Sequence, residues 1–223
     1  MIKNRVLALV YRSAAFLAVL FGIFLVGGVF GGEVRPGLFL YYTVQSNIVV
    51  LVYFLVSAIK TAAVLKQDGA AGTCGFFPRV QAGVLLCIFL TFIVFWAILA
   101  PFMAGVKGYL ASYENLSVHL VCPLLMIADY IFFSQSAKLK KVDPIINLAV
   151  PLIYLAEALS VGFSGAATFS MNGQIETTRF PYYFINFDLA GYMILLYIPL
   201  MALFYYGMGR LLLYIDGKRK ATV

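Results

Sequence analysis

The sequence predicts an all-α, polytopic integral membrane protein, in which residues 1–223 form a single domain of six transmembrane helices. Hydrophobic residues make up 63% of the chain and charged residues only 11%, whereas an ordinary soluble domain has about 45–50% and about 25%. The mean hydropathy is +0.97. The apolar residues fall into six runs, each long enough to cross a bilayer. These observations exclude a soluble globular domain, a disordered chain and a collagen-like repeat.

The six predicted spans are residues 6–30, 38–65, 80–102, 115–133, 144–163 and 189–215. The first follows the basic start MIKNR. It is longer than a signal-peptide core and has no clear A-x-A cleavage site, so we expect a retained helix. The second and sixth have length to spare for tilt, and the third carries Trp96 toward one end, as in an aromatic belt. The fourth and fifth are long enough to span, and loops of about 7 to 25 residues predict that consecutive helices are neighbours.

The positions of the charges predict the orientation of the spans. The net charge is +7, but the basic residues lie in short clusters between apolar runs, which is typical of membrane orientation and not of nucleic-acid binding. If the N-terminus is cytoplasmic, thirteen basic residues share its side: Lys3, Arg5, Arg12, Lys60, Lys66, Arg79, Lys138, Lys140, Lys141, Arg210, Lys218, Arg219 and Lys220. The other side has Arg35, Lys107 and Arg179. We therefore expect both termini in the cytoplasm and a multi-pass cell-membrane protein, such as one of a bacterial inner membrane.

The three cysteines predict neither a disulfide framework nor a metal site. Cys87 and Cys122 lie within apolar runs and Cys74 lies in a loop, without a C-x-x-C pair or a Cys/His ligand spacing. We expect no metal and no cofactor.

Polar residues inside the spans are the candidates for function, because an Asp, Lys or Arg at a helix centre costs about 2.5–3.5 kcal/mol in a membrane. They are Thr43, Gln45, Ser46, Asn47, His119, Asp129 and Glu157, with Asp188 at the start of the last span. At a rise of 1.5 Å per residue, Thr43, His119 and Glu157 each lie about 6–7 Å below the outer face. A hydroxyl, the single imidazole of the chain and a carboxylate are therefore predicted in one layer.

This layer has the groups that nucleophilic catalysis requires. A threonine hydroxyl needs a base to take its proton, and a histidine can accept that proton and return it to a leaving group. We expect Thr43 to be the nucleophile and His119 its base. Glu157 is the candidate by depth for the group that orients the imidazole. Ser46 and Asn47 share the helix face of Thr43 and could donate hydrogen bonds to an oxyanion.

Structural alternatives stand beside these roles. Thr43 could bond its own i−4 carbonyl, the Gln-Ser-Asn segment after it could hold helices together, and His119 could be a satisfied buried side chain. Asp129 lies about 15 Å deeper than His119, where a pair with a basic residue such as Lys138 would explain it. The segment 164–187 is either a lid over the site or an interfacial anchor.

Three short stretches resemble one known family. They are YYTVQSN at 41–47, HLVCPLLMIAD at 119–129 and FPYYF at 180–184. In order and placement they are similar to the androgen-induced and androgen-dependent TFPI-regulating membrane proteins and their bacterial relatives. The animal members are multi-span hydrolases of fatty acid esters of hydroxy fatty acids. The resemblance implies that Thr43 is the nucleophile, that His119 is the histidine and that Asp129 matches an acidic position.

The sequence thus predicts an intramembrane threonine hydrolase of lipid-like esters, with supporting roles for Asn47, Ser46, Glu157, Asp129 and Asp188. Three alternatives stay open: an acyltransferase that uses the same residues, a small transporter or lipid-binding protein without covalent chemistry, and a relative that has lost activity and only acts as a scaffold. The expected partners are a lipid or fatty acyl ester substrate and the bilayer.

Overall fold

The computed structural model describes residues 1–223 except 33, 104, 106–107, 137, 171–176 and 220–223. Its long helices are α1 (Arg5–Val26), α2 (Tyr42–Asp68), α3 (Pro78–Val94), α6 (Cys122–Phe133), α8 (Ala149–Ser164) and α10 (Ile194–Arg219). Shorter helices adjoin them: α4 (Ala100–Met103), α5 (Tyr113–Leu116), α7 (Asp143–Asn147) and α9 (Phe187–Ala190). Turns of 3-10 helix cover Val29–Gly31, Pro36–Leu40, Tyr183–Ile185 and Gly191–Met193. A two-residue antiparallel pairing, β1 (Phe169–Ser170) with β2 (Thr177–Thr178), lies between α8 and α9.

The prediction of an all-α protein with six helices of membrane-spanning length and composition is confirmed for the described residues. The six segments are Arg5–Val26, Tyr42–Asp68, Pro78–Met103, Tyr113–Phe133, Asp143–Ser164 and Phe187–Arg219. Their ends differ from the predicted ones by at most four residues. The first helix ends early because two glycines follow it, and Gly28 adopts a left-handed φ of 75° that favours glycine.

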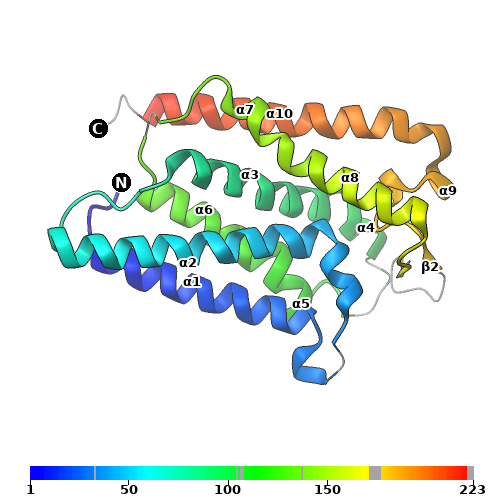
Figure 1. The fold of residues 1–223 in the computed structure, drawn as a ribbon, viewed down its shortest axis with the longest axis horizontal. Coiled ribbons are helices and arrows are strands. Elements are labelled where there is room, and N and C mark those ends of the chain that lie inside the picture. Colours follow the sequence, from blue (N-terminus) through cyan, green and yellow to red (C-terminus); the bar gives the residue numbers. More distant parts are fainter. Residues whose placement is uncertain (33, 104, 106–107, 137, 171–176, 220–223) are drawn as a thin grey trace.

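The core lies among α1, α2, α3 and α6. Val19 of α1, Phe54 of α2, Ile88 of α3 and Met126 of α6 are among the buried side chains that pack there. The span that contains α3 is central, since 56% of its apolar stretch is buried, against 17% for the span of α8 and 11% for that of α10. Figure 1 shows α8 and α10 on the side of the bundle away from α1. These two helices therefore expose most of their apolar surface.

Both ends of the described chain lie at the same end of the bundle (Figure 1). The backbone N–H of Ile2 donates to the carbonyl of Phe132 at 2.8 Å. The guanidinium of Arg219 donates to the carbonyl of Ile131 at 3.2 Å. Both ends therefore contact the last turn of α6. An even number of helices that cross the bundle places the two termini at the same end in this way.

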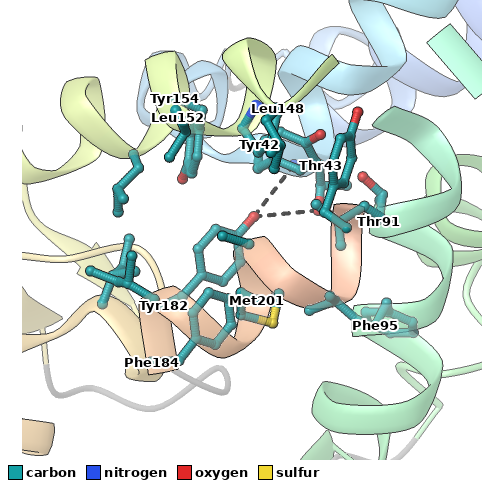
Figure 2. Close-up of a pocket in the computed structure, with 18 of the residues that line it drawn as sticks. Tyr42, Thr43, Thr91, Phe95, Leu148, Leu152, Tyr154, Tyr182, Phe184 and Met201 are labelled. Carbon is teal, nitrogen blue, oxygen red and sulfur yellow. Dashed lines mark hydrogen bonds between the residues drawn. The ribbon is translucent and has the colours of Figure 1, made fainter. Parts of the chain in front are cut away.

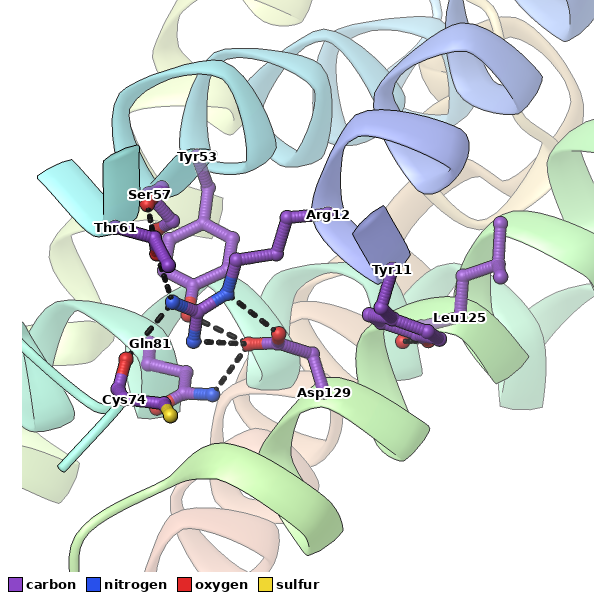
Figure 3. Close-up of polar contacts among 9 residues, drawn as sticks. All are labelled: Tyr11, Arg12, Tyr53, Ser57, Thr61, Cys74, Gln81, Leu125 and Asp129. Atoms are coloured by element: carbon purple, nitrogen blue, oxygen red, sulfur yellow. Dashed lines mark hydrogen bonds and ion pairs between the residues drawn. The ribbon is translucent and has the colours of Figure 1, made fainter. Parts of the chain in front are cut away.

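A buried polar cluster joins α1, α2, α3 and α6 (Figure 3). One carboxylate oxygen of Asp129 lies 2.9 Å from Nε of Arg12. The other accepts from the hydroxyl of Tyr53 at 2.7 Å and from the amide of Gln81 at 2.6 Å. Arg12 also donates to the hydroxyl of Thr61 at 2.8 Å. A charge pair removed from solvent needs such additional hydrogen bonds to be tolerated.

Asp129 pairs with a basic residue, as the sequence predicts, but that residue is Arg12 of α1 and not Lys138. Arg12 is 1% exposed and shares one buried face of α1 with Ala8 and Ala15, the face that packs against the bundle. Lys138 lies beyond the end of α6. Arg12 therefore lies inside the bundle and does not mark a membrane surface.

Candidate active site

Thr43 lies in the first turn of α2, as the second residue of the helix. The first N–H groups of a helix have no partner within it, and that of Thr43 donates to the hydroxyl of Tyr182 at 3.4 Å. The carbonyl of Thr43 accepts from Ser46 Oγ at 3.0 Å and from Asn47 Nδ2 at 2.7 Å. The backbone of Thr43 is thus held from two directions, which gives its hydroxyl a defined position.

Ser46 and Asn47 do not point their donors at a reacting oxygen, which corrects the role expected for them. Ser46 uses its single proton on the carbonyl of Thr43 and lies 2.7 Å from Thr91 Oγ1, so Thr91 donates to Ser46. Asn47 Nδ2 is used on the carbonyls of Thr43 and Val118. Because Ser46 and Asn47 follow Thr43 by three and four residues, both side chains lie next to its carbonyl and donate hydrogen bonds to it.

His119 lies in a turn of π-helix, Ser117–Val121, between α5 and α6. In this turn the N–H of Cys122 donates to the carbonyl five residues before it. The carbonyl of Val118 therefore loses the partner that a regular α-helix would supply. Asn47 of α2 donates to this carbonyl at 3.2 Å. The irregular turn at His119 is thus tied to the helix that carries Thr43.

Pro123 frees the next carbonyl in the same way. Proline has no N–H, so the carbonyl of His119 lacks its donor from one helical turn ahead. The indole N–H of Trp96 donates to it at 2.9 Å. Trp96 lies in a second π-helical turn, Phe95–Leu99, which continues α3. Side chains from α2 and α3 therefore fix the backbone on both sides of the imidazole, and π-turns of this kind are frequent at functional sites.

Asn115 determines which nitrogen of His119 carries the proton. The Nδ1 atom lies 2.8 Å from Asn115 Oδ1 and 3.2 Å from the carbonyl of Asn115. The Asn115 amide nitrogen donates to the carbonyl of Leu110 at 3.1 Å, which directs Oδ1 toward the ring. Both neighbours of Nδ1 are acceptors, so Nδ1 is protonated and Nε2 has the free lone pair. Phe95 stacks on the ring, with centroids 3.7 Å apart and planes 16° apart.

The free Nε2 of His119 faces the hydroxyl of Thr43. The two atoms are 3.3 Å apart, a spacing typical of a nucleophile and its base in an unliganded site. Because Nδ1 of His119 is a donor, the hydroxyl proton of Thr43 points to Nε2 in this contact. The two residues expected to react are therefore brought together from α2 and the α5–α6 span.

The hydroxyl of Tyr182 completes the surroundings of Thr43, at 3.5 Å from Oγ1. Tyr182 lies in the segment between β2 and α9, whose position depends on Gly162 of α8. A Cβ atom at Gly162 would be 2.1 Å from the ring of Phe180, so only glycine allows this ring to pack against α8. Tyr182 also stacks on Phe184, with centroids 5.2 Å apart. Burial raises the pKa of Tyr182, so its hydroxyl is protonated at neutral pH.

A cavity of about 100 Å³, partly open to its surroundings, adjoins Thr43 (Figure 2). Thr43 of α2, Thr91 of α3, Leu152 of α8 and Met201 of α10 are among the residues that line it. No charged side chain is among the described residues that line it, so the cavity is suited to an apolar, uncharged ligand portion.

The three carboxylates given supporting roles from the sequence do not contact Thr43 or His119. Glu157 accepts from the side chain of Gln45 at 2.8 Å and not from His119, whose Nδ1 is used by Asn115. Asp188 forms an exposed ion pair with Arg179, with Nε at 3.0 Å. Asp129 belongs to the cluster around Arg12. Glu157 was expected at a depth similar to that of His119, but its carboxylate faces Gln45 of α2 and not the imidazole.

Two residues of this site escaped the sequence reasoning. Asn115 precedes His119 by four residues, so the helical spacing places it on the same face and could have revealed it. Tyr182 lies within the FPYYF stretch, but its contact with Thr43 comes from a loop and leaves no periodic signal. The segment 164–187, expected to be a lid or an anchor, includes residues 171–176, which lie outside the described residues.

No protein-family model, no curated protein and no solved structure matches this chain. Within the part of the chain that the structure describes, no group of three or more His, Cys, Asp or Glu side chains could hold a metal ion.

Proposed function

We propose that this protein is an intramembrane hydrolase that cleaves lipid-like esters through an acyl-threonine intermediate. The observation that carries the proposal is the chain of contacts from Thr43 Oγ1 to His119 Nε2 and from His119 Nδ1 to Asn115 Oδ1, beside an apolar cavity. A nucleophile, a base and a group that orients the base recur in this series in enzymes of unrelated folds. The sequence resemblance to a family of ester hydrolases supports the same reaction class.

In the first half of the reaction, Thr43 attacks the carbonyl carbon of the ester. The hydroxyl proton of Thr43 moves to Nε2 of His119 while the new C–O bond forms. The Oδ1 atom of Asn115 accepts a hydrogen bond from Nδ1–H and so stabilises the imidazolium, as the third member of a triad does. The tetrahedral intermediate then expels the alcohol, which takes the proton from His119, and the acyl group stays on Thr43.

In the second half, a water molecule takes the place of the alcohol. His119 accepts a proton from the water as its oxygen attacks the acyl carbon. Collapse of this intermediate breaks the bond to Thr43, whose oxygen recovers the proton from His119. The carboxylic acid is released and the site returns to its starting state, so no external redox partner or cofactor takes part in the balance.

The cavity is suited to the acyl chain of such a substrate. It lies beside Thr43 between α2, α3, α8 and α10, and apolar side chains such as Leu148, Leu155 and Ile198 dominate its walls. Each methylene group that leaves water contributes about 0.8 kcal/mol. An acyl chain held there would place its ester beside Thr43 with water partly excluded, which strengthens the electrostatic interactions of the site.

We infer that both termini face the cytoplasm and that the site lies near the opposite face of the membrane. Without Arg12, twelve basic residues remain on the predicted cytoplasmic side against three on the other; of these fifteen, Lys107 and Lys220 lie outside the described residues. The last residue of α2, Asp68, contacts Arg5 at the end with the termini. Thr43 lies 25 residues before Asp68, which is about 38 Å along the helix.

Covalent labelling tests the proposal directly. The purified protein in detergent is treated with a long-chain fluorophosphonate probe and its intact mass is measured, with peptide mapping of the adduct. We expect one adduct on Thr43, and its loss in Thr43→Ala. Glu157→Gln is the matched control, because its carboxylate contacts Gln45 and not the site, and it should be labelled like the parent.

Turnover of a long-chain chromogenic ester gives the second readout. Thr43→Ala and His119→Ala should each lose several orders of magnitude, and the double variant should be little worse, because such residues act as a unit. Thr43→Ser keeps the hydroxyl and should retain part of the activity. A protein that only binds or transports lipid would not react with the probe. An acyltransferase would react and then favour an added alcohol over water. Parent-like turnover by Thr43→Ala would refute the proposal.

A further inference from the structure

The hydroxyl of Tyr182 contacts both the backbone and the side chain of Thr43. It accepts the N–H of Thr43 at 3.4 Å and lies 3.5 Å from Thr43 Oγ1. Figure 2 shows it pointing along the cavity wall toward Thr43. Since the backbone N–H supplies the hydrogen of one contact, the proton of Tyr182 itself is free for another acceptor.

Three other polar side chains near Thr43, those of Ser46, Asn47 and Thr91, have no proton to offer. The hydrogens of Ser46 and Asn47 go to carbonyl groups. Thr91 donates to Ser46, because the proton of Ser46 is already used on Thr43. A tetrahedral intermediate on Thr43 would therefore carry a negative oxygen that these three side chains do not stabilise, although such stabilisation is usually the largest electrostatic part of ester cleavage.

We propose that Tyr182 is a further catalytic residue, whose O–H donates a hydrogen bond to the carbonyl oxygen of the ester as that oxygen becomes negative. This inference rests on the proposed hydrolysis at Thr43. When Thr43 Oγ1 bonds to the carbonyl carbon, the electron pair of the C=O double bond moves to the oxygen. That oxygen is attached to the same carbon as Oγ1, within reach of a hydroxyl 3.5 Å from Oγ1.

Tyr182 keeps its proton throughout, and His119 carries the one that is transferred. The N–H of Thr43 strengthens the Tyr182 donor, because a hydroxyl that accepts a hydrogen bond becomes a better donor in a chain of this kind. The packing of Phe180 against Gly162 holds the segment in place before the substrate binds, so little reorganisation is needed in the transition state.

The matched pair Tyr182→Phe and Tyr183→Phe tests the inference. Both substitutions remove one hydroxyl from neighbouring tyrosines. Tyr183 is 47% exposed and does not line the cavity. We expect Tyr182→Phe to lower kcat by about 100- to 1,000-fold with little change in KM, as the loss of one oxyanion donor does, and Tyr183→Phe to behave like the parent. Thermal unfolding of both variants shows whether the fold is kept.

A second measurement separates catalysis from structure. A long-chain trifluoromethyl ketone forms a hemiketal with a nucleophilic hydroxyl and so mimics the tetrahedral intermediate. In Tyr182→Phe its inhibition constant should rise by about the same factor as kcat/KM falls, whereas a purely structural defect would raise KM and lower the melting temperature. If Thr43→Ala is inactive but Tyr182→Phe turns over within about threefold of the parent, only this inference fails. If Thr43→Ala stays active, the proposed function fails, and the inference with it.

Discussion

Replacing Asp129 with asparagine should strongly destabilise the protein, by an amount that follows from the buried cluster. Asparagine keeps an oxygen for the two donors that share one carboxylate oxygen, Tyr53 at 2.7 Å and Gln81 at 2.6 Å. What is lost is the negative charge beside Arg12, which is 1% exposed, and the oxygen that accepts from Arg12 Nε, because the amide NH2 group takes its place. Leaving one member of a buried ion pair without its partner costs about 3–5 kcal/mol.

A second substitution should recover much of this loss. In the double variant Arg12→Met with Asp129→Asn, no buried charge remains without a partner, and methionine fills much of the space of the arginine stem. Removal of a whole buried ion pair is often neutral or stabilising. The double variant should therefore be more stable than either single variant, which is the opposite of what additive effects would produce.

The native cysteines supply the assay. Cys74, Cys87 and Cys122 are all free and buried, so a thiol-reactive fluorogenic dye reports unfolding in detergent as they become accessible. For a chain of this size, about 3–5 kcal/mol corresponds to a fall of roughly 6–20 °C in the melting temperature. Asp188→Asn is the matched control, because it makes the same chemical change in an ion pair whose side chains are 47% and 44% exposed, and it should melt close to the parent.

Two results would refute this reasoning. One is an Asp129→Asn variant that melts within about 2 °C of the parent, against the shift expected from a buried pair of this kind. The other is a double variant no more stable than the singles. The folded fraction of Asp129→Asn should also still hydrolyse ester, because Asp129 does not contact His119. Its complete inactivation at full folding would instead indicate that Asp129 has the supporting role in catalysis that the sequence predicts.

The remaining predictions concern orientation and pH. Single cysteines that replace Ala111 and Lys140 should be labelled by an impermeant maleimide from opposite sides, with Lys140→Cys reached from the cytoplasm; labelling of both from one side would contradict the orientation. Turnover should fall on acidification, because a protonated His119 cannot accept the proton of Thr43. On the alkaline side it should persist to about pH 10, the ordinary pKa of tyrosine, because burial raises the pKa of Tyr182 and keeps its donor proton. A fall in kcat between pH 8 and 9 that disappears in Tyr182→Phe would contradict the raised pKa.

Position along the long axis of the helix bundle was predictable from the sequence. The lengths of the apolar runs set the six spans, and a fixed rise per residue placed Thr43 and His119 in the same layer. The structure brings them to 3.3 Å. The even number of spans likewise placed both ends of the chain together. These are one-dimensional properties, and counting residues along each helix is enough to obtain them.

Rotation of the helices about their axes was decided only by the tertiary structure. Glu157 has the predicted depth but meets Gln45, and Asp129 meets Arg12 of α1 and not Lys138. Asn47 and Trp96 hold the carbonyls that the π-helical turn and Pro123 leave free beside His119. The loop that carries Tyr182 packs through Phe180 against Gly162. The sequence by itself determined which polar groups share a layer of the membrane. Which of them touch was decided by helix packing, because the direction of each side chain around its helix depends on all the neighbours that pack against it.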